Sequence, residues 1–442
     1  MKTTETLLHA RWVIPVEPDA VVLEYHSIAI DEGRISAILP SAEARQSYQA
    51  QTTLELDRHA LIPGFVNTHT HAAMSLLRGI ADDLPLMDWL QHHIWPAEQK
   101  WVSEQFVHDG TQLAVAEMLR SGTTCFNDMY FFPEVSARVA ASGAIRACVG
   151  IILIDFPTAY ADNPEQYFAK GLALADEYKH HPLISCAFAP HAPYTVSDQP
   201  LKQVQVLSDE LDLPVHIHLH ETASEIENSL NDTGQRPLDR LEQLGLLSPA
   251  LVGVHMTQLE DNEIRRLAEA GASVVHCPES NLKLASGFCP VQPLLEAGVN
   301  VALGTDGAAS NNDLDMLGEM RSAALLAKAV QQDASALPAH TALRMATLNG
   351  ARALGIATET GSLENGKWAD ISAIDLGALE TQPLYDPVSQ LVYAAGREQV
   401  TDVWVAGQHV LKTRELTHLD TQELVQRARG WQTRIAAGDP GL

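Results

Sequence analysis

Residues 63–71 read Pro-Gly-Phe-Val-Asn-Thr-His-Thr-His, a short apolar run that ends in two histidines, His69 and His71. Side chains two positions apart on a strand point to the same face of the sheet. His69 and His71 could therefore present two imidazoles to one point, as a metal site requires. The alternative is a chance pairing in a chain with 19 histidines, and the rest of the sequence decides between the two.

Similar apolar runs recur through the middle of the chain. Longer amphipathic stretches with helical spacing, such as 104–121 and 200–211, lie between them. This alternation predicts parallel strands joined by right-handed crossovers. Eight such runs predict an α/β fold built on a (β/α)8 TIM barrel. The runs are Leu61–Val66, Thr123–Phe126, Ala144–Leu153, Leu183–Phe188, Pro214–Leu219, Leu251–His255, Ala272–His276 and Val299–Leu303.

Both ends of the barrel region are flanked by short strand-like segments with turns. Two such segments, 27–30 and 35–39, surround a tight turn, and similar signals return after Leu363. Each flank is too short to bury a core alone, so the flanks are expected to combine. The predicted domains are residues 1–60 plus 361–420 as a composite β-sandwich, residues 61–360 as the barrel, and residues 421–442 as a C-terminal helix and tail.

The composition limits the kind of partner. The chain has 442 residues, of which 29 are basic and 56 acidic, giving a formal charge of -27. Nucleic acid and anionic membranes would be repelled on average, so a small neutral or cationic molecule is expected. We see no signal-peptide core and no run near the ~20 apolar residues of a membrane span. The 5 cysteines lack Cys-x-x-Cys spacing, which favours reduced thiols in a cytoplasmic protein.

Metal-competent residues follow nearly every predicted strand. The fourth run is followed by His191, the fifth ends in 218–221, the sixth and seventh end in His255 and His276, and the eighth is followed by Asp306. The active site of a barrel lies at the C-terminal ends of its strands, so these residues are predicted to converge. The sequence motifs of serine hydrolases, dinucleotide-binding folds, P-loop proteins and zinc proteases are absent.

The fifth run carries three histidines with strand spacing, His216, His218 and His220. Successive inward positions step about 6.6 Å along a strand, so only one or two of them can reach a metal at the barrel mouth. His218 is the predicted ligand, His216 a deeper hydrogen-bonded histidine, and the role of His220 stays open. Glu221 breaks the alternation. A strand that curls into a loop there could aim Glu221 at the site as a proton carrier, and a solvated loop acid is the equal alternative.

The roles of two residues at later strand ends, His255 and Asp306, stay open at this point. His255 could be a metal ligand or a hydrogen-bond donor to an attacking water. Asp306 precedes a small-residue turn, where its carboxylate could bind metal and accept a proton. The alternative for Asp306 is the N-cap of the next helix.

These residues, in this order, resemble the amidohydrolase superfamily over nearly the whole chain, and more closely the 5'-methylthioadenosine/S-adenosylhomocysteine deaminases. The match to the superfamily is carried by 63–71, His218, Glu221, His255 and 305–307. The closer resemblance is carried by Leu77-Arg78-Gly79, Trp89, Trp95-Pro96-Ala97-Glu98, Asp128-Met129-Tyr130, Pro190-His191-Ala192-Pro193-Tyr194, Ser280-Asn281-Leu282-Lys283-Leu284 and Gly304 to Asn312.

The resemblance implies a zinc-dependent aminohydrolase with one ion per subunit, although Fe2+ or Mn2+ would suit the same ligand types. The implied metal ligands are His69, His71, His218 and Asp306. Glu221 would carry protons to and from the purine ring, His255 would orient the attacking water, and Asp306 would take its proton. The implied reaction is hydrolytic deamination at C6 of an adenine nucleoside, with release of ammonia.

The resemblance also implies the substrate contacts. His191 and Ser310 would contact the base together with Glu221, and Trp89 would line the pocket. Glu98 would bind the ribose, since a carboxylate can accept hydrogen bonds from both hydroxyls of a cis-diol. The implied partner is a small purine nucleoside, and the chain is expected to form a homo-oligomer, either a dimer or a tetramer.

One segment departs from the family pattern. Relatives that accept S-adenosylhomocysteine are expected to bind its carboxylate with arginines after the third strand, yet residues 151–169 contain no Arg or Lys. Acidic residues there, such as Asp155 and Glu165, would repel a carboxylate. The sequence therefore favours 5'-methylthioadenosine, and then adenosine, unless Arg78 or a partner subunit supplies the charge.

Two other functions stay open. The same residues would serve an amidohydrolase acting on another nitrogen heterocycle, of the guanine deaminase or chlorohydrolase type, although Glu98 would then have no ribose to bind. A non-catalytic barrel scaffold is the alternative from a different class. Every position that the resemblance matches is filled, which disfavours the scaffold.

Overall fold

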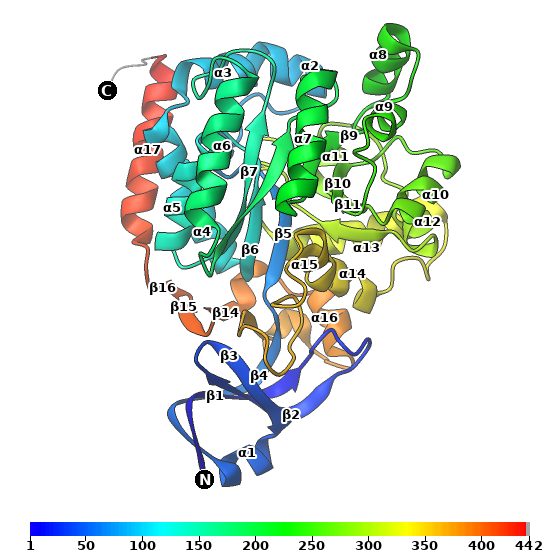
Figure 1. The fold of residues 1–442 in the computed structure, drawn as a ribbon. Coiled ribbons are helices and arrows are strands. Elements are labelled where there is room, and N and C mark those ends of the chain that lie inside the picture. The colour runs from blue at the N-terminus through cyan, green and yellow to red at the C-terminus, as the bar shows by residue number, and fades with distance from the viewer. Residues whose placement is uncertain (439–442) are drawn as a thin grey trace.

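A barrel of eight parallel strands forms the centre of the computed structural model, which describes residues 1–438 (Figure 1). The strands are hydrogen-bonded in the order β12-β11-β10-β9-β8-β7-β6-β5, as a series of right-handed crossovers requires. The predicted α/β TIM barrel is therefore confirmed. Its strands are β5 (Phe65–Thr70), β6 (Thr123–Asp128), β7 (Arg146–Leu153), β8 (Ile184–Pro190), β9 (Val215–Leu219), β10 (Leu251–His255), β11 (Ser273–His276) and β12 (Asn300–Leu303).

The barrel strands are buried on both faces. All eight residues of β7 are buried, for example, which explains why the sequence shows continuous apolar runs rather than alternation. The first predicted run, 61–66, differs from the structure. Its first residues end strand β4 of the other sheet at Pro63, and the barrel strand β5 begins after Gly64, at Phe65.

Helices connect the barrel strands and cover the outside of the barrel, as Figure 1 shows for α4 to α7. Two short helical segments, α2 and η2, precede α3 and run beside the pocket described below. The elements between β5 and β13 are η1 (Ala72–Leu77), α2 (Leu86–Trp89), η2 (Leu90–Ile94), α3 (Trp95–Trp101), α4 (Glu104–Arg120), α5 (Pro133–Ser142), α6 (Pro164–Tyr178), α7 (Asp198–Leu211), α8 (Ala223–Thr233), α9 (Pro237–Gln243), α10 (Asp261–Ala270), α11 (Pro278–Lys283), α12 (Val291–Glu296), α13 (Met316–Gln331), α14 (Ala339–Met345) and α15 (Leu348–Ala353).

A second sheet takes its strands from both ends of the chain, in the order β16-β15-β14-β13-β4-β1-β2-β3. Strand β4 joins the two ends, because it pairs in parallel with β1 and antiparallel with β13. The elements of this domain are β1 (Lys2–Val13), β2 (Leu23–Asp31), β3 (Arg34–Pro40), α1 (Ser41–Ser47), β4 (Tyr48–Pro63), β13 (Ile371–Asp375), η3 (Leu379–Thr381), α16 (Pro387–Tyr393), η4 (Arg397–Gln399), β14 (Val400–Val405), β15 (Gln408–Lys412) and β16 (Glu415–Leu416).

The second sheet buries its own apolar cluster, which includes Leu8, Ile28, Ile371 and Trp404. The predicted combination of the two flanks into a β-sandwich domain is therefore confirmed, while the domain boundaries remain a prediction. A buried ion pair joins this domain to the barrel, with Arg146 Nε 3.0 Å from Asp370 Oδ2.

Helix α17 (Thr421–Ala437) returns to the barrel and packs along α4. The indole N–H of Trp431 donates to Asp109 of α4 at 3.0 Å, which holds the two helices together. Within residues 1–438, no helix combines the length and the apolar character that crossing a membrane would need.

Candidate active site

Four side chains from three places in the barrel meet at its centre. His69 lies in β5, His71 directly after it, His218 in β9 and Asp306 after β12. One ligand atom from each lies within 4.8 Å of the others. The Nε2 atoms of His69 and His71 are both 3.2 Å from Asp306 Oδ1. The predicted metal ligands are thus brought together, as a metal site needs.

A close backbone approach makes this meeting possible. Gly304 precedes Thr305 and Asp306, and a Cβ at Gly304 would lie 2.8 Å from the backbone nitrogen of His69. Only glycine leaves room for the end of β12 to reach β5 here. The Asp306 N–H then donates to the His69 carbonyl at 3.0 Å, which holds the carboxylate beside the histidines.

In each of the three histidines, the ring nitrogen that faces away from the cluster, Nδ1, lies within hydrogen-bonding distance of another group of the protein. His71 Nδ1 is 2.6 Å from the Met129 carbonyl, and His218 Nδ1 is 2.8 Å from the His191 carbonyl. A carbonyl only accepts, so both Nδ1 atoms carry a proton, and in the neutral form of each ring Nε2 is the nitrogen with the lone pair that a metal needs. His69 Nδ1 is 2.9 Å from Nε2 of His216, the deeper histidine that the strand spacing predicts to be hydrogen-bonded. Three Nε2 atoms therefore face one point, an arrangement typical of metal-binding histidines.

The electrostatics of the cluster also fit a cation. Burial lowers the pKa of His69 to about 4 and that of His218 well below its usual value, so both imidazoles are neutral. Burial opposes a charge on Asp306, but hydrogen bonds from His69 and His71 hold its pKa well below the ordinary range. Burial would lower the pKa of His71 as well, yet Asp306 outweighs it and raises that pKa to about 9. A buried carboxylate needs a positive partner. The protonated ring of His71 fills that role in this structure, and a divalent ion bound to the same atoms would fill it equally.

Glu221 and His255 lie beside the four ligands. Glu221 Oε2 is 3.9 Å from His255 Nε2, and both residues line the same cavity. Burial raises the pKa of Glu221, as expected for a carboxyl group removed from water. The Nδ1 atom of His255 is 2.8 Å from the Asn281 side-chain oxygen. Of the two interpretations left open for Glu221, the solvated loop acid does not fit this burial.

Other histidines of the sequence lie outside the cluster. His220 points away, and its Nε2 accepts from the Leu238 N–H at 3.1 Å. His276 is buried and does not line the cavity. A position at the end of a strand does not by itself distinguish His220 and His276 from the predicted ligand His218.

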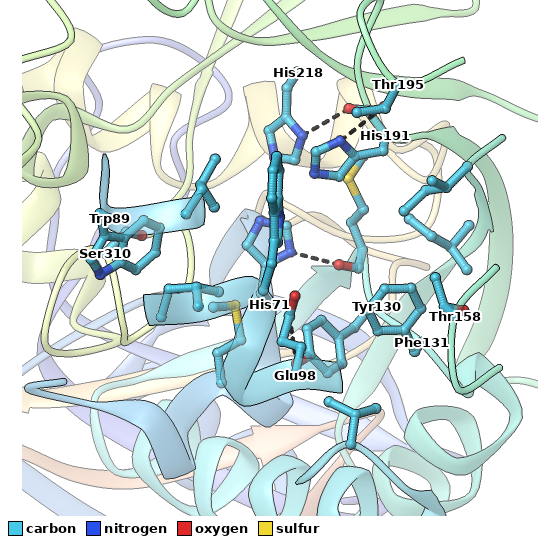
Figure 2. A pocket seen from close by; sticks show the side chains of 18 of the residues that line it. His71, Trp89, Glu98, Tyr130, Phe131, Thr158, His191, Thr195, His218 and Ser310 are labelled. Atoms are coloured by element: carbon cyan, nitrogen blue, oxygen red, sulfur yellow. Dashed lines mark hydrogen bonds between the residues drawn. The ribbon is translucent and has the colours of Figure 1, made fainter. Parts of the chain in front are cut away.

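The cluster forms one end of a cavity of about 630 Å3. In Figure 2, His191 and His218 lie at one end of this pocket, and Glu98 and Tyr130 lie at the other. The Tyr130 hydroxyl donates to Glu98 Oε1 at 2.8 Å. Burial raises the pKa of Glu98 to about 7, and the bond from Tyr130 opposes that rise.

The remaining predicted substrate residues also line the cavity. Trp89, His191 and Ser310 all do so. Burial lowers the pKa of His191 to about 3, so its ring is neutral, with Nδ1 3.1 Å from the Thr195 hydroxyl. The Ser310 hydroxyl donates to Asp306 Oδ2 at 2.7 Å, so its hydrogen is committed to Asp306 in this structure.

The far wall of the cavity is apolar and comes from segments distant in sequence. No lysine or arginine lines the cavity among the described residues. Arg78, which the sequence left as a source of charge, is bound to Glu117 and to the Asn312 carbonyl instead. The apolar wall includes Leu90, Ile94, Phe131, Ile152, Ile154 and Phe156.

Three supporting residues, Ser280, Asn281 and Tyr130, appear in the sequence only as parts of family motifs, and their roles were not predicted. Ser280 donates to Asp306 Oδ2 at 2.7 Å, and Asn281 holds His255. Tyr130 was noted only as part of a motif, although it is the direct partner of Glu98. No periodic signal marks these residues, because their partners are brought near only by the closure of the barrel.

A (β/α)8 barrel with three histidines and an aspartate converging at the C-terminal ends of its strands defines a metal-dependent hydrolase. The sequence pattern of the amidohydrolase family matches residues 60–410. A Teredinibacter turnerae protein named 5-methylthioadenosine/S-adenosylhomocysteine deaminase is 51% identical over 435 residues, covering 98% of both chains. A Saccharophagus degradans protein of the same name is 51% identical over 433 residues, covering 98% of this chain and 97% of that protein. The chain therefore belongs to the amidohydrolase family, in the group that carries this name.

Solved structures agree with this assignment. The crystal structure of an adenosine deaminase from Xanthomonas campestris with bound zinc is 57% identical, with a TM-score of 0.98 over 99% of both chains. An atrazine chlorohydrolase variant from Arthrobacter aurescens is 23% identical, with a TM-score of 0.90 over 96% of this chain and 99% of that one, and shares the fold.

Proposed function

We propose that this chain catalyses the zinc-dependent hydrolytic deamination of an adenine nucleoside at C6. The preferred substrate would be 5'-methylthioadenosine, which water converts to 5'-methylthioinosine and ammonia. One observation carries the proposal: a single cavity joins the four converging metal ligands and buried Glu221 to a second buried carboxylate, Glu98. Zinc bound in the adenosine deaminase from Xanthomonas campestris supports the choice of metal.

The positions of the residues around the cluster support the following roles in the proposed reaction. The ion, held by His69, His71, His218 and Asp306, would polarise the attacking water and lower its pKa from about 15.7 towards about 7. Asp306 would accept a proton from that water, and His255 would hydrogen-bond to the water. Glu221 would protonate N1 of the purine and later deliver a proton to the departing amine. Each positioned acid or base of this kind contributes typically about 10²–10⁴-fold.

The other end of the cavity selects a nucleoside with an uncharged tail. Glu98, held by Tyr130, would accept hydrogen bonds from the ribose hydroxyls. Apolar side chains such as Ile152 and Phe131 would surround a methylthio group. The carboxylate of S-adenosylhomocysteine would meet no cation from this chain among the described lining residues, so that substrate is expected to be poorer.

A different heterocycle is the second candidate function. A guanine deaminase or chlorohydrolase would use the same metal ligands, and the fold is shared with an atrazine chlorohydrolase. Such substrates have no ribose, so Glu98 would receive a hydrogen bond from Tyr130 but none from the substrate's sugar. The Glu98–Tyr130 pair therefore favours the nucleoside.

The expected partners are consistent with this activity. The charge of -27 favours a small neutral substrate over nucleic acid or an anionic membrane. A dimer or tetramer and a place in the cytoplasm are part of the same proposal.

The first test is ammonia release from zinc-loaded protein. Methylthioadenosine, adenosine, S-adenosylhomocysteine and guanine would be compared at equal concentration. We expect the highest kcat/KM with methylthioadenosine. If S-adenosylhomocysteine is preferred, the account of the apolar wall is wrong. A preference for guanine would mean that the chain acts on another nitrogen heterocycle, which is the second candidate function, and not on an adenine nucleoside.

A further inference from the structure

Glu221 faces the site although strand alternation would point it elsewhere. His218 faces the metal cluster, and one more step of alternation would bring His220, not Glu221, to the same side. The backbone changes course between them, because His220 has a φ of 53°, in the left-handed region. His220 thereby turns away, and the carboxylate of Glu221 enters the cavity. Something must hold this turn, since a non-glycine residue rarely adopts it.

Both oxygens of Glu225 are bound to this turn. Oε1 accepts from the His220 N–H at 3.1 Å, and Oε2 accepts from the Glu221 N–H at 2.7 Å. The Glu225 side chain is buried, with 8% exposure, so the two amides are its main polar partners. On the opposite side, the Thr257 hydroxyl donates to the Glu221 carbonyl at 2.7 Å. The peptide groups around Glu221 are therefore held on both sides.

The alternative explanation is an ordinary helix cap. Glu225 lies in the first turn of α8, and Thr222 caps that helix by accepting from the Glu225 N–H at 3.2 Å. In a capping box, a glutamate three residues after the cap bonds back to the backbone of the cap residue itself. Here the carboxylate interacts with the Thr222 backbone and also reaches further back, to the amides of residues 220 and 221, which precede the helix. Its bonds therefore fix the turn that carries Glu221.

We propose that Glu225 is a positioning residue that holds the left-handed turn at His220 and so aims the Glu221 carboxylate at the substrate. The proposal rests on the proposed function for its kinetic consequence, because Glu221 is the proton carrier of that reaction. Only a carboxylate serves both amides. A glutamine has one acceptor oxygen, and its NH2 group would face the second N–H, donor against donor.

The test compares Glu225→Gln with Thr222→Ala as a matched control. Both variants weaken the start of α8, but only Glu225→Gln removes a hydrogen bond from the turn at 220 and 221. We expect Glu225→Gln to bind zinc fully, keep KM for methylthioadenosine within about 3-fold, and lose about 10–100-fold in kcat. Thr222→Ala should keep its kcat while its melting temperature falls as much as that of Glu225→Gln.

A substrate comparison separates positioning from a loss of folded protein. Chloride leaves from C6 without needing a proton, whereas an amine must be protonated, so a 6-chloro analogue of the nucleoside depends less on Glu221. The kcat loss in Glu225→Gln should be smaller on the 6-chloro analogue. A folding defect would lower both rates equally, and would overturn the proposal. A kcat in Glu225→Gln equal to that of the wild type would also overturn it.

Hydrogen exchange tests the turn independently of the reaction. The amides of 220 and 221 should exchange slowly in the wild type and faster in Glu225→Gln, whereas Thr222→Ala should affect the amides of α8. This result holds even if the wild type deaminates none of the nucleosides, which separates failure of the proposed function from failure of this proposal. If Glu225→Gln does not fold, Glu225→Asp, which is one methylene shorter and reaches at most one amide, takes its place. Unchanged exchange at 220 and 221 would overturn the proposal.

Discussion

The two ends of the cavity are built in different ways. At the metal end, buried polar side chains come from strand ends, and hydrogen bonds hold each outer ring nitrogen, as with His71 on Met129. At the tail end, most of the apolar side chains, such as Ile94 and Phe156, come from helices and loops, and Ile152 comes from strand β7. Phe156 is 46% exposed, whereas His69 is completely buried. One end is a buried polar centre, and the other is a partly exposed apolar wall.

The difference suggests which parts of the molecule carry the reaction and which carry the choice of substrate. Side chains on strands hold positions more accurately than those on loops, and catalysis depends on accurate positions. An apolar wall discriminates by size and charge, with smaller free energies. Substitutions should therefore have effects that decline from the metal end to the tail end.

The largest effect is expected from Asp306→Ala. The carboxylate contacts both His69 and His71, so its removal should abolish zinc binding and lower kcat/KM at least about 10³-fold. Zinc content by atomic absorption and ammonia release would be measured together. Ser280→Ala is the control, since it removes only one hydrogen bond to Asp306. Full zinc occupancy in Asp306→Ala would exclude Asp306 as a ligand.

Glu221→Gln should separate metal binding from proton transfer. The variant keeps the shape of the side chain but cannot exchange protons, so zinc should remain while kcat falls about 10²–10⁴-fold. Zinc content and kcat on methylthioadenosine measure the two properties. A rate equal to that of the wild type would remove Glu221 from the mechanism.

Glu98→Gln should affect the binding of the ribose and the pH dependence of the reaction. With a pKa of about 7, Glu98 is protonated at lower pH and loses acceptor capacity there. The kcat/KM for methylthioadenosine should therefore rise as the pH increases through about 7, and Glu98→Gln should remove this rise. At pH 8 the variant should lose about 10–100-fold. Free adenine serves as the control substrate, and an equal loss on it would contradict the ribose role.

The smallest effect is expected from Phe156→Arg at the tail end. A partly exposed arginine would give the carboxylate of S-adenosylhomocysteine a partner, although exposed ion pairs contribute little. The ratio of kcat/KM for S-adenosylhomocysteine to that for methylthioadenosine should rise by up to about 5-fold. Phe156→Leu controls for the loss of the aromatic ring. If this ratio rises by a larger factor than the loss of kcat/KM in Glu98→Gln, the expected decline of effects from the metal end to the tail end is wrong.

Much of this molecule could be predicted from local patterns. Eight apolar runs separated by helical stretches predicted the barrel, because buried parallel strands need continuous apolar sequence. The residues that follow those runs included His69, His218 and Asp306, because a barrel brings the ends of its strands to one face. The alternation of strands also separated His216 from His218, since it sets their depth.

Other features depend on contacts between residues far apart in the chain. The first run was divided wrongly, since the place where β4 ends depends on its pairing with β13 and not on local composition. The sequence could not choose between the two interpretations of Glu221, because its direction depends on the turn at His220 and the carboxylate of Glu225. Tyr130 meets Glu98 only because the loop after β6 faces α3.

The sequence by itself thus determined the barrel, the order of the ligands and the family resemblance, because periodicity and spacing are local properties. Only the tertiary structure decided the tautomers of the histidines, the direction of Glu221 and the apolar character of the tail end. Each of these depends on which groups are neighbours in space. Hydrogen-bond partners and burial are set by the closed fold, and a linear pattern does not contain them.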